Sequence, residues 1–202
     1  MTSNTGHHDG GQGGCRALRA DARRNVARVL EAAEEVFSTQ GLAVPIDVVA
    51  VRAGVGIGTV YRHFPTKEAL FKAVVVARLE SLVERARQLS TATDAGEAMF
   101  TFVGEVAALA SEKKDLTDEL ARAGIDSEAV HSTVRDELER AFDVLLCRAQ
   151  AAGAVRHDIT SPEVTALLMG TCMAADMRRE KESTCRLVAI LCDGLRAGPP
   201  HR

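Results

Sequence analysis

Four polar side chains lie close together around Pro65: Tyr61, Arg62, His63 and Lys67. A phenol hydroxyl or an ammonium group can bind phosphate oxygens, and a guanidinium can donate two parallel hydrogen bonds to a guanine edge. Lys67 falls in the first turn of an expected helix, where the helix dipole does not favour a cation. An anionic partner is therefore the better explanation of Lys67, and the cluster indicates contact with nucleic acid.

Glycines in the same segment fit this chemistry. Gly56 and Gly58 are poor choices for a helix whose only task is stability, but small residues let a recognition helix approach DNA closely. Three apolar residues recur at roughly helical spacing and are expected to face a core: Val55, Val60 and Phe64. Thr59, Arg62 and His63 then fall on other faces.

The surrounding elements are predicted to be helices. Apolar spacing and the positions of glycine predict three of them before Pro65, at about residues 21–40, 46–52 and 57–64. Gly41 and Gly54 suit the ends of the first two, and Pro45 suits the first turn of the second. Thr66 is a candidate N-cap for a long fourth helix. Two short helices joined at a glycine suggest a helix-turn-helix.

The local sequence is more specific than this pattern. Residues 53–70 (AGVGIGTVYRHFPTKEAL) closely resemble the DNA-binding signature of the TetR family of bacterial transcriptional regulators, and residues 29–41 resemble that family's first helix. The resemblance implies a helix-turn-helix DNA-binding domain at 21–65 and a helical effector-binding and dimerisation domain at 66–198. Residues 1–20 are expected to be a disordered arm, because residues 1–14 hold five glycines and almost nothing apolar.

The resemblance also implies roles for individual residues. Phosphate oxygens would be bound by Thr59, Tyr61, His63 and Lys67, and the residues closest to base edges would be Ile57, Gly58 and Arg62. Each role has an alternative: Tyr61 at the edge of the core, His63 in packing or capping, Arg62 as a solvated charge. Val48 and Val51 make the second helix more apolar than is typical of the family.

The rest of the chain is predicted to be helical too, which makes the fold class all-α. Aromatic residues are only 3%, and no proline occurs between Pro65 and Pro162. Helices are expected at about 94–113, around Leu116 and Leu120, at about 126–152, from Ser161 as the cap, and at about 183–196.

The last two helices are unusually apolar, and the resemblance assigns dimerisation to them. A helix that is apolar on two faces must bury both, one inward and one against a partner. The expected homodimer interface consists of Leu167, Gly170, Ala174, Leu187, Ile190, Leu191 and Leu195. The alternative is that both helices are central in a monomer.

The middle helices are expected to enclose an effector pocket. Its candidate lining is Met99, Phe100, Phe102, Val103, Val106, His131, Val134, Arg135, Leu138, Phe142, Met169 and Met173. The chain has too few aromatic residues to support an aromatic cage for a quaternary cation. A neutral or weakly acidic apolar molecule therefore fits better. His131 or Arg135 would be its polar contact. A packed core without a pocket, with His131 at the surface, is the alternative.

Composition argues against other classes of function. The net charge of −3 argues against non-specific polyanion binding. Neither HExxH nor GxSxG occurs, and the one ExxH pair, Glu128 and His131, lacks the second pair of a di-iron site. The five cysteines have no metal-ligand spacing and are expected to be small buried residues.

The sequence therefore predicts a non-enzymatic, ligand-responsive transcriptional regulator, a repressor released from double-stranded operator DNA by a small apolar effector. No metal and no cofactor are expected. With neither a signal peptide nor a membrane-length apolar stretch, we expect a cytoplasmic protein without a membrane partner. A helical protein-interaction module without DNA binding is the competing hypothesis.

Overall fold

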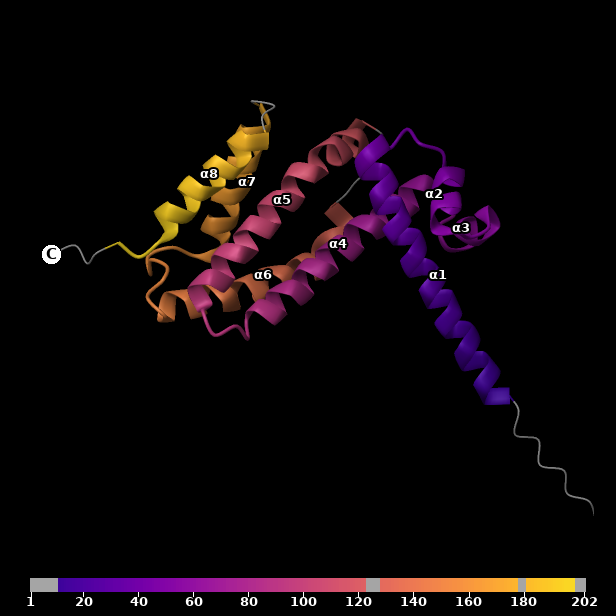
Figure 1. Cartoon of the computed structure of the whole chain (residues 1–202), viewed down its shortest axis with the longest axis horizontal. Helices are drawn as coiled ribbons and strands as arrows, with labels where there is room; N and C mark the ends of the chain where they lie inside the picture. Colours follow the sequence, from indigo (N-terminus) through magenta and orange to yellow (C-terminus); the bar gives the residue numbers. More distant parts are fainter. Residues whose placement is uncertain (1–10, 123–127, 178–180, 199–202) are drawn as a thin grey trace, which may run out of the picture. The chain divides into compact units, whose positions relative to one another are not determined.

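The computed structural model describes the backbone of residues 11–122, 128–177 and 181–198, and the side chains of residues 21–110, 134–175 and 184–198. These residues form eight helices (Figure 1). The chain divides into two compact units, residues 1–74 and 75–202, with the division inside the fourth helix.

The first unit is built on three helices that pack against one another: α1 (Gly11–Gln40), α2 (Ile46–Ala53) and α3 (Ile57–His63). It also contains the start of α4 (Lys67–Leu89). Val29, Ala33 and Phe37, spaced by one helical turn, are buried on α1, as the apolar stripe predicts. Phe37 packs against Phe71 of α4 with ring centroids 6.0 Å apart. The unit therefore extends to Val74, beyond Pro65, where the sequence placed its end.

Glycine ends both α1 and α2, as predicted. Gly41 and Gly54 have φ angles of +76° and +64°, which glycine adopts at little cost. The expected first-turn position of Pro45 is wrong: Pro45 is the N-cap residue of α2, with extended backbone. Thr66 is confirmed as a cap, because its Oγ1 accepts a hydrogen bond from the Ala69 N–H at 3.1 Å.

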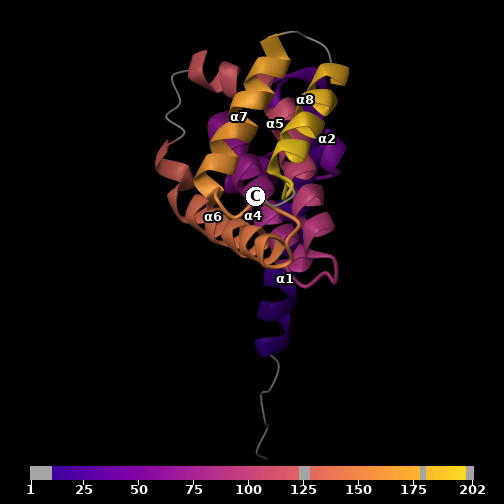
Figure 2. The ribbon, with the colours of Figure 1, turned by 90° about the vertical axis from the view of Figure 1, so that its left-hand side faces the viewer.

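The second unit contains the rest of α4, with α5 (Ala95–Arg122), α6 (Glu128–Ala151), α7 (Ser161–Met177) and α8 (Lys181–Leu195). α7 and α8 lie side by side, and α5 packs against α6, α7 and α8 (Figures 1 and 2). One apolar cluster fills the space between these helices. Its large members include Met99, Phe102, Phe142, Leu145 and Leu168.

Two helix boundaries differ from the expectation. α1 begins at Gly11, so the predicted arm at 1–20 is helical from that residue on; good helix formers such as Ala17, Leu18 and Ala20 follow, with no proline to stop the helix. The arm's first ten residues lie outside the described part of the chain. α5 is one helix through Arg122 where two were expected, because neither glycine nor proline interrupts it after Gly104.

The start of α7 also differs in detail. Thr160, not Ser161, is the cap: its backbone carbonyl accepts the Val164 N–H at 3.0 Å, and Glu163 Oε2 accepts both the Thr160 N–H and hydroxyl. These hydrogen bonds lower the pKa of Glu163. The Ser161 hydroxyl donates to the carboxylate of Asp143 on α6.

Candidate nucleic-acid interface

α3 has a sharply divided surface. Val60 is fully buried and Phe64, just after the helix, is 8% exposed, whereas Ile57 and Tyr61 are 43% and 46% exposed. Arg62 and His63 are exposed as well, and Thr59 and Val55 are half-buried. The predicted core residues Val60 and Phe64 therefore face inward. The predicted contact residues of α3 are exposed, except Thr59, which is half-buried.

The two glycines at the start of α3 serve no packing purpose within the chain. A Cβ atom built on Gly56 or on Gly58 would have no heavy atom within 4 Å. Both residues are exposed. The open space above them is room for an external surface to approach the backbone of α3 closely.

Lys67 stands at the first position of α4 and is half-buried. Beside it, the carboxylate of Glu68 accepts hydrogen bonds from its own backbone N–H and from the Thr66 hydroxyl, which together lower the pKa of Glu68. The Thr66 side chain thus fixes the start of α4. Only Pro65 and Thr66 separate Phe64, the C-cap residue of α3, from Lys67. Lys67 thus follows the exposed residues of α3 closely in the chain, with the buried Phe64 between them.

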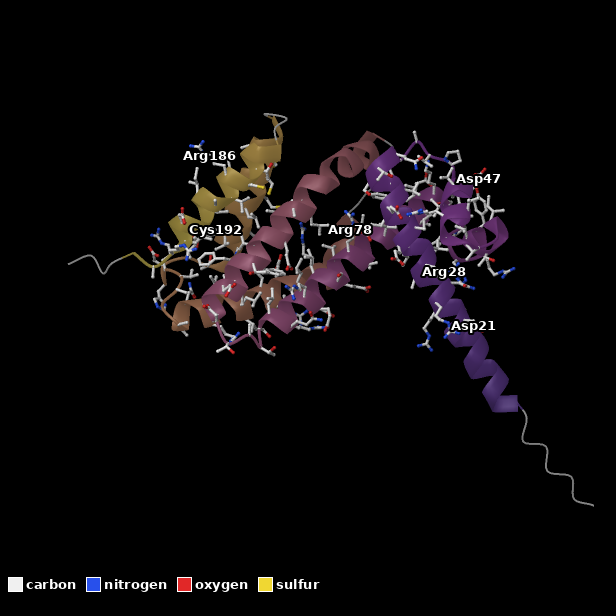
Figure 3. The ribbon with its side chains drawn as sticks, in the orientation of Figure 1. Asp21, Arg28, Asp47, Arg78, Arg186 and Cys192 are labelled. Atoms are coloured by element: carbon white, nitrogen blue, oxygen red, sulfur yellow. The ribbon has the colours of Figure 1, made fainter. Side chains whose placement is uncertain are left out.

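Two further contacts support this unit, and sequence reasoning missed both. Arg52 of α2 binds Glu35 of α1 through two hydrogen bonds, of which Nε to Oε2 is 2.8 Å. The hydrogen bond and charge of Glu35 raise the pKa of Arg52. Arg28 of α1, labelled in Figure 3, donates to the backbone carbonyls of Ala53 and Gly54. No short-range pattern marks such pairs, because their members are far apart in sequence.

The residues predicted to line an effector pocket differ in how deeply they are buried. Met99, Phe102, Val103 and Phe142 are buried in the core cluster, with the two phenyl rings 5.6 Å apart. Phe100, Val106 and Leu138 are partly buried against that cluster. Val134 is half-buried and Arg135 is exposed, whereas the side chain of His131 lies outside the described residues.

Met169 and Met173 do not join this set within one chain. They are 36% and 71% exposed on the outer side of α7, while Leu168 and Cys172 of the same helix face the core. Their expected contribution to a pocket inside the second unit therefore has no counterpart in the single chain.

A hollow of about 490 Å³ lies at the first turn of α5. Among the described residues, its lining includes one member of the predicted effector set, Phe100, with Asp94, Glu97 and Thr101. The guanidinium of Arg196 covers the Phe100 ring at 4.4 Å from the centroid. The hollow is therefore mixed in polarity, unlike the apolar pocket that the sequence predicts.

The outer faces of α7 and α8 carry most of the predicted dimer residues. Leu167 and Ile190 are 49% and 58% exposed, and Gly170 and Ala174 are exposed between them in the chain. Leu187 and Leu191 are half-buried. Leu195, by contrast, is 2% exposed and belongs to the core of its own chain, so it offers no surface to a partner.

The cysteines also differ from the expectation of uniform burial. Cys172 is buried and Cys192 half-buried, and burial raises the pKa of both thiols. Cys147 and Cys185 are exposed, so the prediction is wrong for these two. Cys15 lies outside the described side chains. Within the described parts, no helix combines the length and the apolar character needed to cross a membrane.

Family profiles match both units. The profile described as "Bacterial regulatory proteins, tetR family" matches residues 29–74, and the profile described as "Transcriptional regulator SbtR-like, C-terminal domain" matches residues 94–197. The second match alone spans half of the chain. The first includes α2, α3 and the polar cluster around Pro65.

Solved structures and curated relatives agree with these profiles. A TetR transcription regulatory protein from Mycobacterium vanbaalenii is 42% identical; the match covers 89% of this chain and 99% of that one, with a TM-score of 0.74. The TetR transcriptional regulator SCO0520 from Streptomyces coelicolor is 30% identical, covers 86% of this chain and 99% of that one, and has a TM-score of 0.75.

The HTH-type transcriptional repressor KstR from Mycobacterium tuberculosis is 29% identical over 140 residues, which are 67% of this chain and 63% of that repressor. The all-α fold, the helix-turn-helix unit and the family resemblance of the sequence are thus confirmed. A protein-interaction module without DNA binding is not favoured. The chain belongs to the TetR family of DNA-binding transcriptional regulators.

Proposed function

We propose that this regulator binds its operator through the outer side of α3 and the first residue of α4. The observation that carries this proposal is the division of α3: Val60 is fully buried while Ile57 and Tyr61 are nearly half exposed, and Gly58 has open space around it. Such a surface leaves the backbone and the outer side chains of α3 free to contact a partner. A helix that enters the major groove needs it.

Within this surface, the side chains have two kinds of role, phosphate binding and base recognition. Tyr61, His63 and Lys67, with the hydroxyl of Thr59, bind phosphate oxygens and set the position of α3 on the duplex. Arg62 reads a guanine through two parallel hydrogen bonds, and Ile57 packs against a thymine methyl group. Gly58 keeps the backbone close to the base edges.

One recognition helix reads too few base pairs for specific control, so a two-fold dimer reads two half-sites. The exposed apolar residues on α7 and α8, among them Leu167, Met173 and Ile190, support a dimer formed through these helices. Small Gly170 and Ala174 allow close approach of the partner. Met169 and Met173 belong to this interface in the proposal, since their exposed positions on α7 fit it.

The regulator acts as a repressor in the cytoplasm, where bacterial DNA lies, and a small apolar effector releases it. The name of the similar protein KstR supports repression. Met99, Phe102 and Phe142 fill the centre of the predicted effector site, so a ligand there must displace at least one of these side chains. Binding then favours a dimer whose recognition helices no longer match their half-sites.

A glycine pair tests the DNA-binding surface. Gly58→Leu places bulk on the outer side of α3, and Gly104→Leu places the same bulk on α5, where a Cβ also meets nothing within 4 Å. Both variants should keep the helical circular dichroism of the parent. Only Gly58→Leu should lose binding to a duplex selected by the parent protein from a random pool. Equal binding by the two variants would contradict the assignment of α3 as the recognition helix.

A further inference from the structure

Arg28 joins the first helix to the turn of the helix-turn-helix. Its Nη2 donates one hydrogen bond to the carbonyl oxygen of Gly54, at 3.1 Å, and a second to that of Ala53. Ala53 is the last residue of α2, and Gly54 is its C-cap. A side chain of α1 therefore caps the end of α2 just before the chain turns into α3.

The cap uses two carbonyl groups that the backbone hydrogen bonds of the turn do not occupy. The amide of Gly54 donates to Val51 and that of Val55 to Ala50, both at 3.1 Å, so the turn satisfies the earlier carbonyls of α2 itself. The carbonyls of Ala53 and Gly54 take their hydrogen bonds from Arg28 instead. A guanidinium is well suited here, because the C-terminal end of a helix carries partial negative charge.

Gly54 makes room for this cap. Its φ of +64° favours glycine, and a Cβ atom there would lie 2.7 Å from Arg28 Nη2. The guanidinium therefore occupies the place of a side chain at position 54. Any residue other than glycine would have to push the guanidinium away from the turn.

We infer that Arg28 is a positioning residue for DNA recognition, acting through the turn at Gly54. α3 starts at Ile57, three residues after this turn, so the angle at which α3 leaves α2 depends on how the turn is held. α1 packs against both α2 and α3. Arg28 adds a polar link between α1 and the turn to this apolar packing.

The role predicts a particular signature in DNA binding. In Arg28→Ala the affinity for a duplex selected by the parent from a random pool should fall about tenfold, which corresponds to roughly the net contribution of one hydrogen bond to a charged group. The dependence of affinity on salt should stay unchanged, because no phosphate contact is lost. Arg28→Lys should recover part of the loss, since an ammonium can still reach one carbonyl. Unchanged affinity, or a salt slope lowered by about one unit, would overturn the inference.

Arg24→Ala is the matched control. Arg24 lies one turn earlier on α1, is exposed, and pairs with Asp21 instead of the turn. The Arg24→Ala variant should bind the same duplex with the affinity of the parent.

Hydrogen exchange of the Val55 amide supplies a readout independent of DNA. Exchange at this amide should accelerate in Arg28→Ala, whereas exchange in the helices of residues 75–202 should be unaffected. Parent-like exchange at Val55 would count against the cap.

A double mutant separates the cap from general destabilisation. Asparagine tolerates a positive φ, so Gly54→Asn mainly displaces the guanidinium. Gly54→Asn should weaken duplex binding much as Arg28→Ala does, and the combination should be no weaker than either single variant by more than about twofold. Losses that multiply would show two independent effects and would reject the coupling through the turn.

Discussion

Lys67 and Arg62 are both cations on the proposed DNA surface, but they have different expected roles. Lys67→Ala should weaken binding to all duplexes by a similar factor and lower the salt slope by about one unit, because one phosphate contact releases about one counterion. Titrations at several salt concentrations measure this. Lys72→Ala, further along α4, serves as the control, and an unchanged slope in Lys67→Ala would remove Lys67 from the interface.

Arg62→Ala should change specificity rather than general affinity. The preference at one base pair of each half-site should relax, at a cost of about 1–3 kcal/mol against the preferred base. Selection from a random duplex pool by each protein gives the preference directly. Arg62→Lys keeps the charge but loses the planar fork, so it should relax the same position. If both variants select the parent's sequence, Arg62 is a solvated charge.

For single residues, the sequence predicts which side of α3 is exposed, because one short helix has one buried side. Val60 and Phe64 establish that side, and the exposed positions of Ile57 and Tyr61 follow from the helical period. The contacts of Arg28 with Ala53 and Gly54 were not predictable in this way. They span 25 and 26 residues and depend on how α1 crosses the end of α2.

Among the elements, helix ends marked by glycine were predictable and those marked by side-chain caps were less so. Gly41, Gly54 and Gly153 all have the left-handed conformation at or near the expected ends. The cap of α7 was assigned to Ser161, but Thr160 has that role. The distinguishing signal is present in the sequence, because Glu163 stands three residues after Thr160, the spacing of a capping box, and only two after Ser161.

The loop before α7 gives a prediction about acid. Two hydrogen bonds from Arg156, at 2.6 and 2.7 Å, lower the pKa of Asp158 from 3.8 to about 2. A carboxyl with a lowered pKa in the folded state stabilises that state above its unfolded pKa, and the contribution disappears as the pH falls through the folded value. Asp158→Asn should therefore melt at a lower temperature than the parent at neutral pH.

The difference between the two melting temperatures should stay constant down to about pH 4 and vanish near pH 2. Because both side chains of the pair are exposed to solvent, the difference at neutral pH should be small. Thermal melts followed by circular dichroism across this range measure it. A difference that persists unchanged below pH 2 would show that Asp158 acts through something other than its charge.

For the molecule as a whole, the sequence predicts two helical units and a partner surface, but not which residues of α7 and α8 remain at that surface. Leu195 is buried and Met173 exposed, although both belong to apolar stripes of similar appearance. Each set of apolar residues packs either in the core of its own chain or against a partner. The choice depends on the rotation of each helix against α5, which the pattern of apolar residues does not contain.

Ile190→Glu tests the partner surface. Ile190 is 58% exposed, so a charge there should leave the chain folded and split the proposed dimer. Light scattering at micromolar concentration should give about twice the 21.6 kDa chain mass for the parent and the single mass for the variant. Operator binding should weaken with it. Leu191 is less suitable, because it packs against its own core.

Val144→Glu is the control for Ile190→Glu. Val144 is 49% exposed on α6, which is not one of the two proposed interface helices. This variant should keep the dimer mass and the DNA affinity of the parent. A monomeric parent, or loss of the dimer in both variants, would rule out the α7 and α8 faces as the specific contact.

The most direct test of the account is selection of duplexes from a random pool by the full chain, with the affinity then measured at increasing salt. Two recognition helices on a two-fold dimer predict one enriched inverted repeat, with half-sites separated by about one helical turn or a multiple of it. Phosphate contacts from Tyr61, His63 and Lys67 predict a steep fall in affinity with salt. Absence of an enriched sequence, or an affinity indifferent to salt, would contradict the claim that α3 reads DNA.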